Sequence, residues 1–147
     1  MRTSENGLKL IAKFEGISRK PYRDVVGLWT IGFGHLIGDG ISLPDYWNRT
    51  LTLEECYDLL ASDVRKFELG VKRYINVELT QNQFDALVSF AFNLGLGTLQ
   101  RSTLRAKLNR KDYKGAISSW LKYNKAGGKV INGLDLRRKA EVILFNS

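Results

Sequence analysis

The side chains best suited to chemistry in this sequence are carboxylates near the N-terminus. Glu15 lies at the expected C-terminal end of a helix, where the helix dipole disfavours a negative charge by about 0.3–1 kcal/mol. Asp24 follows after eight intervening residues and Thr30 after five more. Carboxyl groups can act as general acids and bases. Taken singly, Glu15 also fits an exposed ion-pair partner and Asp24 a turn-capping residue.

Several other chemistries are excluded by missing motifs. The sequence has no phosphate-binding P-loop, no dinucleotide-binding glycine motif and no serine-hydrolase elbow, and its single histidine, His35, cannot form a zincin motif. The single Cys56 allows no internal disulfide, and no Cys and His cluster offers four zinc ligands. We therefore predict no bound metal or cofactor.

The segments around the carboxylates indicate how they are positioned. Thr3 or Ser4 can cap a first helix, and Gly16 is placed to end it directly after Glu15. Residues 22–36, YRDVVGLWTIGFGHL, read as short β-strands separated by glycines, either a hairpin or a three-stranded sheet. Glu15 is thus expected at a helix end, Asp24 in a turn and Thr30 on a strand.

The rest of the chain is expected to be helical. Thr52 and Glu55 form a capping box that opens a helix running to about residue 74, and Thr80 and Gln83 form a second box before an apolar, buried helix. Further helices are expected near 102–109, 112–123 and 134–146, with a Gly-rich loop before the last. The predicted fold class is α+β, mostly helical.

Charge is unevenly distributed along the chain. Lys and Arg number 23 against 15 Asp and Glu, for a net charge of +8. Residues 1–75 carry 11 basic and 10 acidic side chains, whereas residues 76–147 carry 12 and 5. This positive field favours a polyanionic partner such as a bacterial envelope, an anionic lipid or nucleic acid.

The ordered motifs resemble the phage-type lysozymes, the endolysins of glycoside hydrolase family 24. The matching blocks, in order, are KFEG, PYRD, WTIGFGH, AFNLGLGTLQRSTL and GLDLRRKAEVILF. The resemblance implies a lysozyme-like, two-lobed domain with a small β-sheet lobe and a larger helical lobe joined by a long helix. We expect one catalytic domain over 1–147, with the β lobe at about 13–51, the connecting helix at about 52–74, and the helical lobe at about 75–147 plus 1–12.

The resemblance also implies an activity, hydrolysis of the β-1,4 bond between N-acetylmuramic acid and N-acetylglucosamine in bacterial peptidoglycan. Glu15 would be the general acid, Asp24 the ionised carboxylate, and Thr30 the hydroxyl that holds the attacking water. An inverting mechanism is expected, with the two carboxyl groups about 6.5–9.5 Å apart.

Further residues are assigned by the same resemblance. Leu36, Phe92, Asn93 and Thr103 would contact the substrate, although Phe92 equally fits core packing. We expect His35 to be structural rather than catalytic, paired with Asp63 of the following helix.

The resemblance and the composition together predict how the protein would act. No export signal and no membrane-spanning run is visible. We expect a monomer made in the cytoplasm of the host bacterium that attacks the cell wall after a separate holin-like protein permeabilises the membrane, without a nucleic-acid partner. The alternative is a non-enzymatic cationic protein that binds the envelope or nucleic acid through its basic half.

Overall fold

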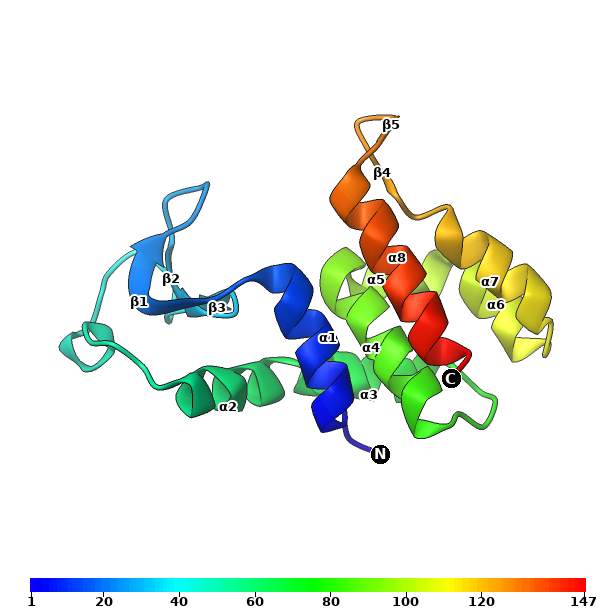
Figure 1. Ribbon diagram of the computed structural model, residues 1–147, viewed down its shortest axis with the longest axis horizontal. Helices are drawn as coiled ribbons and strands as arrows, with labels where there is room; N and C mark the ends of the chain where they lie inside the picture. The colour runs from blue at the N-terminus through cyan, green and yellow to red at the C-terminus, as the bar shows by residue number, and fades with distance from the viewer. The chain divides into compact units, whose positions relative to one another are not determined.

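The structure, a computed structural model, describes all of residues 1–147 and divides into two compact units. The β unit comprises Ile11–Asp63, and the helical unit comprises Met1–Leu10 together with Val64–Ser147. Helix α1 (Glu5–Glu15) begins in the helical unit and ends in the β unit. The elements of the two units together make an α+β, mostly helical fold, as predicted (Figure 1).

The β unit contains a three-stranded antiparallel sheet in the order β1-β2-β3. Its strands are β1 (Ser18–Arg23), β2 (Trp29–Gly32) and β3 (His35–Leu36). A short 3₁₀ helix, η1 (Asp45–Trp47), and helix α2 (Leu53–Asp63) follow. Helix α2 packs against β2 and β3. Of the two sheet arrangements that the sequence allowed, the three-stranded one is present.

Strand β1 tolerates a proline because it is an edge strand with an irregular register. Ser18 pairs with Gly32, whereas Tyr22 pairs with Thr30, so β1 carries two more residues than β2 over the same interval. Pro21 lies in this interval. A proline cannot donate a backbone hydrogen bond, and a bulged edge strand is where that loss is tolerated.

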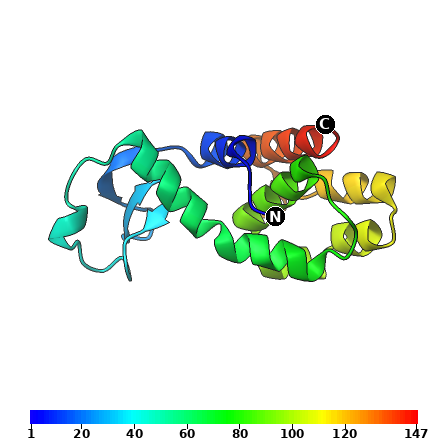
Figure 2. The same cartoon turned by 90° about the horizontal axis from the view of Figure 1, so that it is seen from below.

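The helical unit contains six further helices and a small hairpin. They are α3 (Arg65–Tyr74), α4 (Gln81–Leu94), α5 (Leu96–Arg101), α6 (Thr103–Asn109), α7 (Tyr113–Leu121), the strands β4 (Lys125–Ala126) and β5 (Lys129–Val130), and α8 (Asn132–Phe145). Helix α4 packs along α8, α6 packs against α7, and α3 contacts α4 (Figures 1 and 2).

Helix α4 is the centre of this unit. Thr80 accepts a hydrogen bond from the Gln83 backbone N–H and Gln83 reaches back to Thr80, so the predicted capping box is confirmed. All residues from 84 to 91 are buried, as the apolar pattern predicts. The Trp120 side chain packs edge-on against Phe90 and also contacts Phe145, so this tryptophan belongs to the core.

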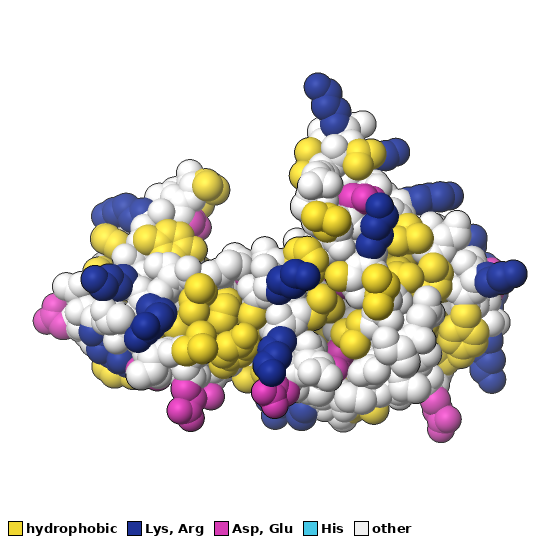
Figure 3. All heavy atoms as spheres, in the orientation of Figure 1, with side chains coloured by type: hydrophobic (Ala, Val, Ile, Leu, Met, Phe, Trp, Pro, Cys, Tyr) yellow, Lys and Arg dark blue, Asp and Glu magenta, His cyan; other side chains and the backbone are white.

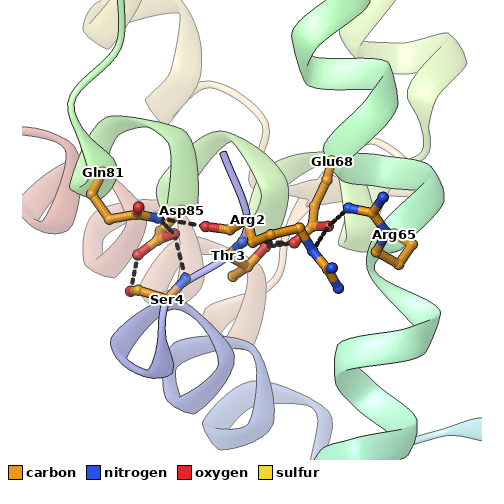
Figure 4. A network of polar contacts seen from close by, with 7 residues as sticks. All are labelled: Arg2, Thr3, Ser4, Arg65, Glu68, Gln81 and Asp85. Atoms are coloured by element: carbon orange, nitrogen blue, oxygen red, sulfur yellow. Dashed lines mark hydrogen bonds and ion pairs between the residues drawn. The ribbon is translucent and has the colours of Figure 1, made fainter.

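Two buried carboxylates hold the residues before α1 on the helical unit (Figure 4). Glu68 of α3 accepts hydrogen bonds from the backbone N–H and the hydroxyl of Thr3, both at 2.6 Å. Arg2 Nε and Arg65 Nη1 each lie 3.0 Å from the same carboxylate. Burial alone would raise the pKa of Glu68, but the bonds from Thr3 and Arg65 and the charge of Arg2 outweigh it and hold the pKa below its usual value.

The second carboxylate, Asp85 of α4, binds the residue that caps α1. It accepts hydrogen bonds from the Ser4 backbone N–H at 3.0 Å, from the Ser4 hydroxyl, and from Gln81 Nε2 at 2.7 Å. Ser4 Oγ in turn accepts from the Gly7 backbone N–H, so Ser4, one of the two predicted candidates, is the N-cap. Gly7 lies so close to Asp85 that an added Cβ would approach Asp85 Cβ to 2.8 Å. The first turn of α1 is therefore fixed tightly on α4.

One helix boundary differs from the prediction. The continuous helix expected over 52–74 is two helices, α2 and α3, separated at Val64. The Phe67 backbone N–H bonds to the Val64 carbonyl three residues back, which is a tighter turn than an α-helix. Val64 is itself fully buried and no Gly or Pro marks the position, so local sequence carries no signal for the break.

Three short elements were not predicted. They are η1, α5 and the β4–β5 hairpin, all in segments that read as loops or as continuations of neighbouring helices. The other expected helices are confirmed to within a few residues. None of the helices combines the length and apolar character needed to cross a membrane.

Candidate active site

Glu15 is the last residue of α1, where Gly16 ends the helix. Gly16 adopts a φ of +73°, a left-handed conformation that favours glycine, and its N–H bonds to the Ala12 carbonyl. The carboxylate lies beside the turn between β2 and β3, because a Cβ added to Gly34 would be 3.9 Å from Glu15 Oε1. Glu15 is thus at the end of the helix, as predicted, and it is an exposed residue next to the sheet.

Asp24 shapes the turn between β1 and β2 with one carboxylate oxygen. Its Oδ1 accepts hydrogen bonds from the backbone N–H groups of Val26 at 3.0 Å and Leu28 at 2.9 Å. Gly27 closes the turn by donating to the Asp24 carbonyl with a φ of +84°. The turn-capping interpretation is therefore correct for Oδ1. Oδ2 makes no hydrogen bond within the protein, so it is available to a ligand or to water.

Thr30 lies in the middle of β2 and is 5% exposed. Its hydroxyl donates to the Leu28 carbonyl at 3.0 Å, so the hydroxyl proton is already used. The oxygen of Thr30 can still accept a hydrogen bond. Asp24 and Thr30 are tied to the same segment, since Leu28 donates to one and accepts from the other.

These three residues all belong to the β unit and are held by backbone contacts within it. Together they provide a carboxyl group at a helix end, a carboxylate oxygen without a partner in the protein, and a hydroxyl oxygen that can accept. Such a set can deliver a proton, remove a proton from water and orient that water.

The predicted contact between His35 and Asp63 is present in the same unit. His35 Nδ1 lies 3.0 and 2.9 Å from the two carboxylate oxygens of Asp63. His35 is on β3 and Asp63 is the last residue of α2, so the contact joins the sheet to this helix. The centroid of the His35 ring lies 5.5 Å from that of the Trp47 ring. These contacts support a structural role for the histidine.

The four residues assigned to substrate contact are divided between the units. Leu36 pairs with Thr30 across β2 and β3 and is 44% exposed, so it is accessible next to the candidate site. Phe92, Asn93 and Thr103 belong to the helical unit. The half-buried Phe92 ring packs edge-on against Phe67 at 5.3 Å, which fits the core-packing alternative. A role of these four residues in substrate binding stays a prediction.

A buried charged network in the helical unit was not foreseen. Arg138, fully buried, lies 2.8 Å from Glu141 and donates to Asn93 Oδ1 at 2.7 Å. Glu141 also accepts from Trp120 Nε1 at 3.0 Å and from Ser89 Oγ at 2.5 Å. Burial lowers the pKa of Arg138, and the negative charge of Glu141 opposes this effect.

The arginines of α8 therefore belong to the core of the helical unit and not to its surface. Arg137 is also buried, and its Nη2 donates to the Ser89 carbonyl at 3.2 Å. The signal that could have revealed this is the position of Glu141, four residues after Arg137 and three after Arg138.

The two units carry opposite net charge. The helical unit holds 18 Lys and Arg against 7 Asp and Glu, for +11, whereas the β unit holds 5 against 8, for −3. Figure 3 shows basic side chains spread over the surface of the helical unit, including the β4–β5 hairpin. The positive field inferred from the sequence thus belongs to the helical unit, which includes the first ten residues.

The fold and the positions of the three polar residues define a lysozyme-like protein of the α+β class. A sequence model of the family described as phage lysozyme matches residues 12–141. The chain is 39% identical to an endolysin of Acyrthosiphon pisum secondary endosymbiont phage 1, over 100% of this chain and 99% of that protein. The chain belongs to the phage lysozyme family.

Other relatives are longer or are known by structure. An endolysin of Bacillus phage B103 is 44% identical over 99% of this chain, but the chain spans only 54% of that protein, and 56% of a second one from Bacillus phage PZA. The crystal structure of a mutant of P22 lysozyme superimposes with a TM-score of 0.88 at 35% identity, covering 100% of this chain and 99% of that chain. The muramidase domain of SpmX from Asticaccaulis excentricus gives 0.85 at 31% identity, covering 99% and 98%.

Proposed function

We propose that this protein is a muramidase of the endolysin type, which hydrolyses the β-1,4 bond between N-acetylmuramic acid and N-acetylglucosamine in bacterial peptidoglycan. The observation that carries the proposal is the arrangement of Glu15, Asp24 and Thr30 in the β unit, with one oxygen of Asp24 left without a partner. The names of the relatives, endolysin and muramidase domain, support the same substrate class.

The proposed roles follow from the hydrogen bonds of each residue. Glu15, in its protonated form, donates its proton to the glycosidic oxygen as the bond to the leaving sugar breaks. Asp24 Oδ2 accepts a proton from the attacking water, because Oδ1 is occupied by Val26 and Leu28. Thr30 Oγ1 accepts the second proton of that water in a hydrogen bond, since its own proton is donated to Leu28. The water oxygen then forms the new bond to the anomeric carbon.

The test is digestion of purified peptidoglycan with the wild type and with Glu15→Gln, followed by mass spectrometry of the new ends. We expect reducing N-acetylmuramic acid ends from the wild type and a loss of at least 100-fold in rate for the variant, on the order of a missing general acid. Glu54→Gln is the matched control, because Glu54 is an exposed glutamate in the first turn of α2. A non-enzymatic cationic protein would release no ends, and anhydro ends would indicate a transglycosylase.

We propose an inverting mechanism, in which the water attacks the face opposite the leaving group. An inverting enzyme gives a product whose anomeric configuration differs from that of the substrate. Proton NMR of a fresh digest, recorded before mutarotation, should therefore show the α-anomer first. Initial appearance of the β-anomer would contradict this mechanism and favour a covalent intermediate on Asp24.

We also propose that the protein acts as a monomer that reaches the wall from the host cytoplasm through a membrane opened by a separate holin-like protein. Four relatives that match 86% of this chain are named SAR-endolysins, whereas other relatives are named endolysins. The route by which this protein reaches the wall is therefore tested separately from its activity. Cells that express the chain alone should stay intact and then lyse within minutes of chemical permeabilisation. Lysis without permeabilisation would refute the dependence on a second protein.

A further inference from the structure

A pocket of about 240 Å³ opens on the β unit between η1 and α2. Leu51 and Leu59 form its apolar base, and Tyr46 and Trp47 form an aromatic wall. Arg49 and Asp58 form a charged rim. None of the residues of the candidate active site lines it. The turn that carries Asp24 and the segment that contains η1 project in different directions from the sheet (Figure 1).

The aromatic wall is rigid and its outer member is solvent-exposed. The Trp47 ring is half-buried between His35 and Tyr46, at centroid distances of 5.5 and 5.2 Å. Tyr46 is 66% exposed, so it contributes little to the core. Backbone bonds from Trp47 to the Pro44 carbonyl and from Arg49 to the Trp47 carbonyl fix this turn. An exposed aromatic ring on a fixed turn is a ready surface for stacking.

Arg49 is held in one orientation at the rim. Its Nη2 donates to Glu55 at 2.7 Å, its Nε donates to the Tyr46 carbonyl at 3.1 Å, and the guanidinium lies 4.9 Å from the Tyr46 ring centre. The bond from Arg49 is the largest of the effects that lower the pKa of Glu55 to about 2. The other oxygen of Glu55 accepts from the Thr52 backbone N–H, so both of its oxygens are used. The bonds of Arg49 involve Nε and Nη2, so Nη1 remains as an oriented donor.

Asp58 supplies the complementary acceptor. It is exposed on α2, lines the pocket and accepts no hydrogen bond from the protein. The pocket thus offers an aromatic face, an apolar base, one oriented donor and one free acceptor. A simple anion would be repelled by Asp58 and Glu55, and a cation by Arg49, so an uncharged ligand with both apolar and hydroxyl faces fits best.

We propose that this pocket binds an N-acetylated hexosamine unit of a glycan strand, as a second carbohydrate site separate from Glu15 and Asp24. The apolar face of the pyranose ring stacks on Tyr46, and a ring hydroxyl donates to Asp58. The acetamido carbonyl accepts from Arg49 Nη1, and its methyl group contacts Leu51 and Leu59. The site holds the protein on the insoluble wall between cleavage events.

A neighbouring hollow allows a strand rather than a single sugar to bind. This hollow has a volume of about 340 Å³, shares Arg49 with the first pocket, and is otherwise lined by Lys20, Pro21, Asn48 and Thr50. The amide and hydroxyl groups there can bind the hydroxyls of the next sugar. The ammonium group of Lys20 matches a carboxylate on that sugar. Two hollows that share one arginine fit two successive units of an alternating strand.

The test uses Glu15→Gln protein, labelled with ¹⁵N, and the N-acetylglucosamine tetramer followed by NMR. We expect the Trp47 indole resonance, assigned with Trp47→Phe, and the Asp58 amide to shift with a common dissociation constant. Tyr46→Ala and Asp58→Ala should each weaken that binding at least 10-fold. Tyr113→Ala, which alters an exposed tyrosine of the helical unit, is the matched control and should leave it within twofold.

The outcomes separate this site from the proposed hydrolysis. The second site would be overturned if the NMR shifts were confined to residues around Glu15, or if the shifts in the pocket persisted unchanged in Tyr46→Ala. Either result would leave the proposed hydrolysis by the wild type unaffected. Cellotetraose, which lacks acetamido groups, should bind at least 10-fold more weakly, and equal binding would overturn the assignment of the acetamido contact. Amide spectra of each variant verify that the fold is retained. Pocket binding without any cleavage by the wild type would support this proposal and refute the hydrolytic one.

Discussion

Replacing Glu68 by glutamine should weaken the attachment of the N-terminal segment and lower the free energy of unfolding by about 2–4 kcal/mol at pH 7. The carboxylate is 1% exposed and accepts both donors of Thr3, which are charge-assisted bonds worth about 1.5–3 kcal/mol each. Both Thr3 donors bind Oε2, so glutamine can keep these bonds through its carbonyl oxygen, but each loses its charge assistance, which is worth about 1 kcal/mol. The NH₂ group of glutamine then replaces Oε1 opposite the donors of Arg2 and Arg65. Arg2 and Arg65 are 59% and 41% exposed, so their ion pairs add at most about 1 kcal/mol each.

Urea unfolding measures this effect directly. With a slope of about 2 kcal/mol per M, the expected loss moves the midpoint by about 1–2 M. Glu5→Gln is the matched control, because Glu5 pairs with Lys9 on the exposed side of α1 and such a pair contributes less than about 0.5 kcal/mol. A midpoint for Glu68→Gln as close to the wild type as that of Glu5→Gln would refute the reasoning.

The difference in unfolding free energy between the wild type and Glu68→Gln should depend on pH. Because the pKa of folded Glu68 is below its usual value, the unfolded chain binds the proton first as the pH falls. The stabilisation is therefore fully present above the unfolded pKa of about 4.5 and is lost as the pH falls through the folded pKa. The difference between wild type and Glu68→Gln should shrink below pH 4.5. A difference that is constant from pH 7 to pH 3 would contradict this assignment.

Three further predictions concern the other charged groups. Glu141→Gln leaves two buried guanidinium groups without their carboxylate and should lower the free energy of unfolding by about 3–5 kcal/mol, measured by urea unfolding; a loss below 1 kcal/mol would contradict the buried network. Asp63→Asn removes the partly exposed partner of His35 and should cost about 1 kcal/mol while cleavage stays within twofold of the wild type; a 100-fold loss of cleavage would instead implicate the pair in chemistry. Binding of Glu15→Gln to purified walls should weaken several-fold between 50 and 500 mM salt because the charge of +11 on the helical unit is screened, and binding that is independent of salt would rule out electrostatic attraction.

Local features of the structure could be predicted from the sequence because they depend on neighbouring residues. The capping boxes at Thr52 and Thr80 and the helix end at Gly16 involve side chains and backbone groups within four residues of each other. The turn-capping role of Asp24 is local in the same sense. The contact between His35 and Asp63 is not local, and its prediction depended on the resemblance to the family.

The break at Val64 and the burial of the α8 arginines could not be predicted in this way. The one glycine within residues 52–74 is Gly70, six residues beyond the break, and nothing nearby requires the tighter turn at Val64. Whether Arg138 faces water or the core depends on partners such as Asn93, 45 residues away in the chain. The cost of burying a charge is acceptable only where such partners are assembled, and a linear pattern does not reveal that assembly.

From the sequence by itself, periodicity and capping determined the fold class, whereas the family and the residues on which the proposed chemistry depends came from ordered motifs that resemble those of the phage-type lysozymes. Tertiary structure decided which oxygen of Asp24 remains available, how charge divides between the units, and that Tyr46, Arg49 and Asp58 share one pocket. The physical reason is that hydrogen-bond partners, burial and net field are properties of groups brought together in space. Residue types along the chain state only which groups are present.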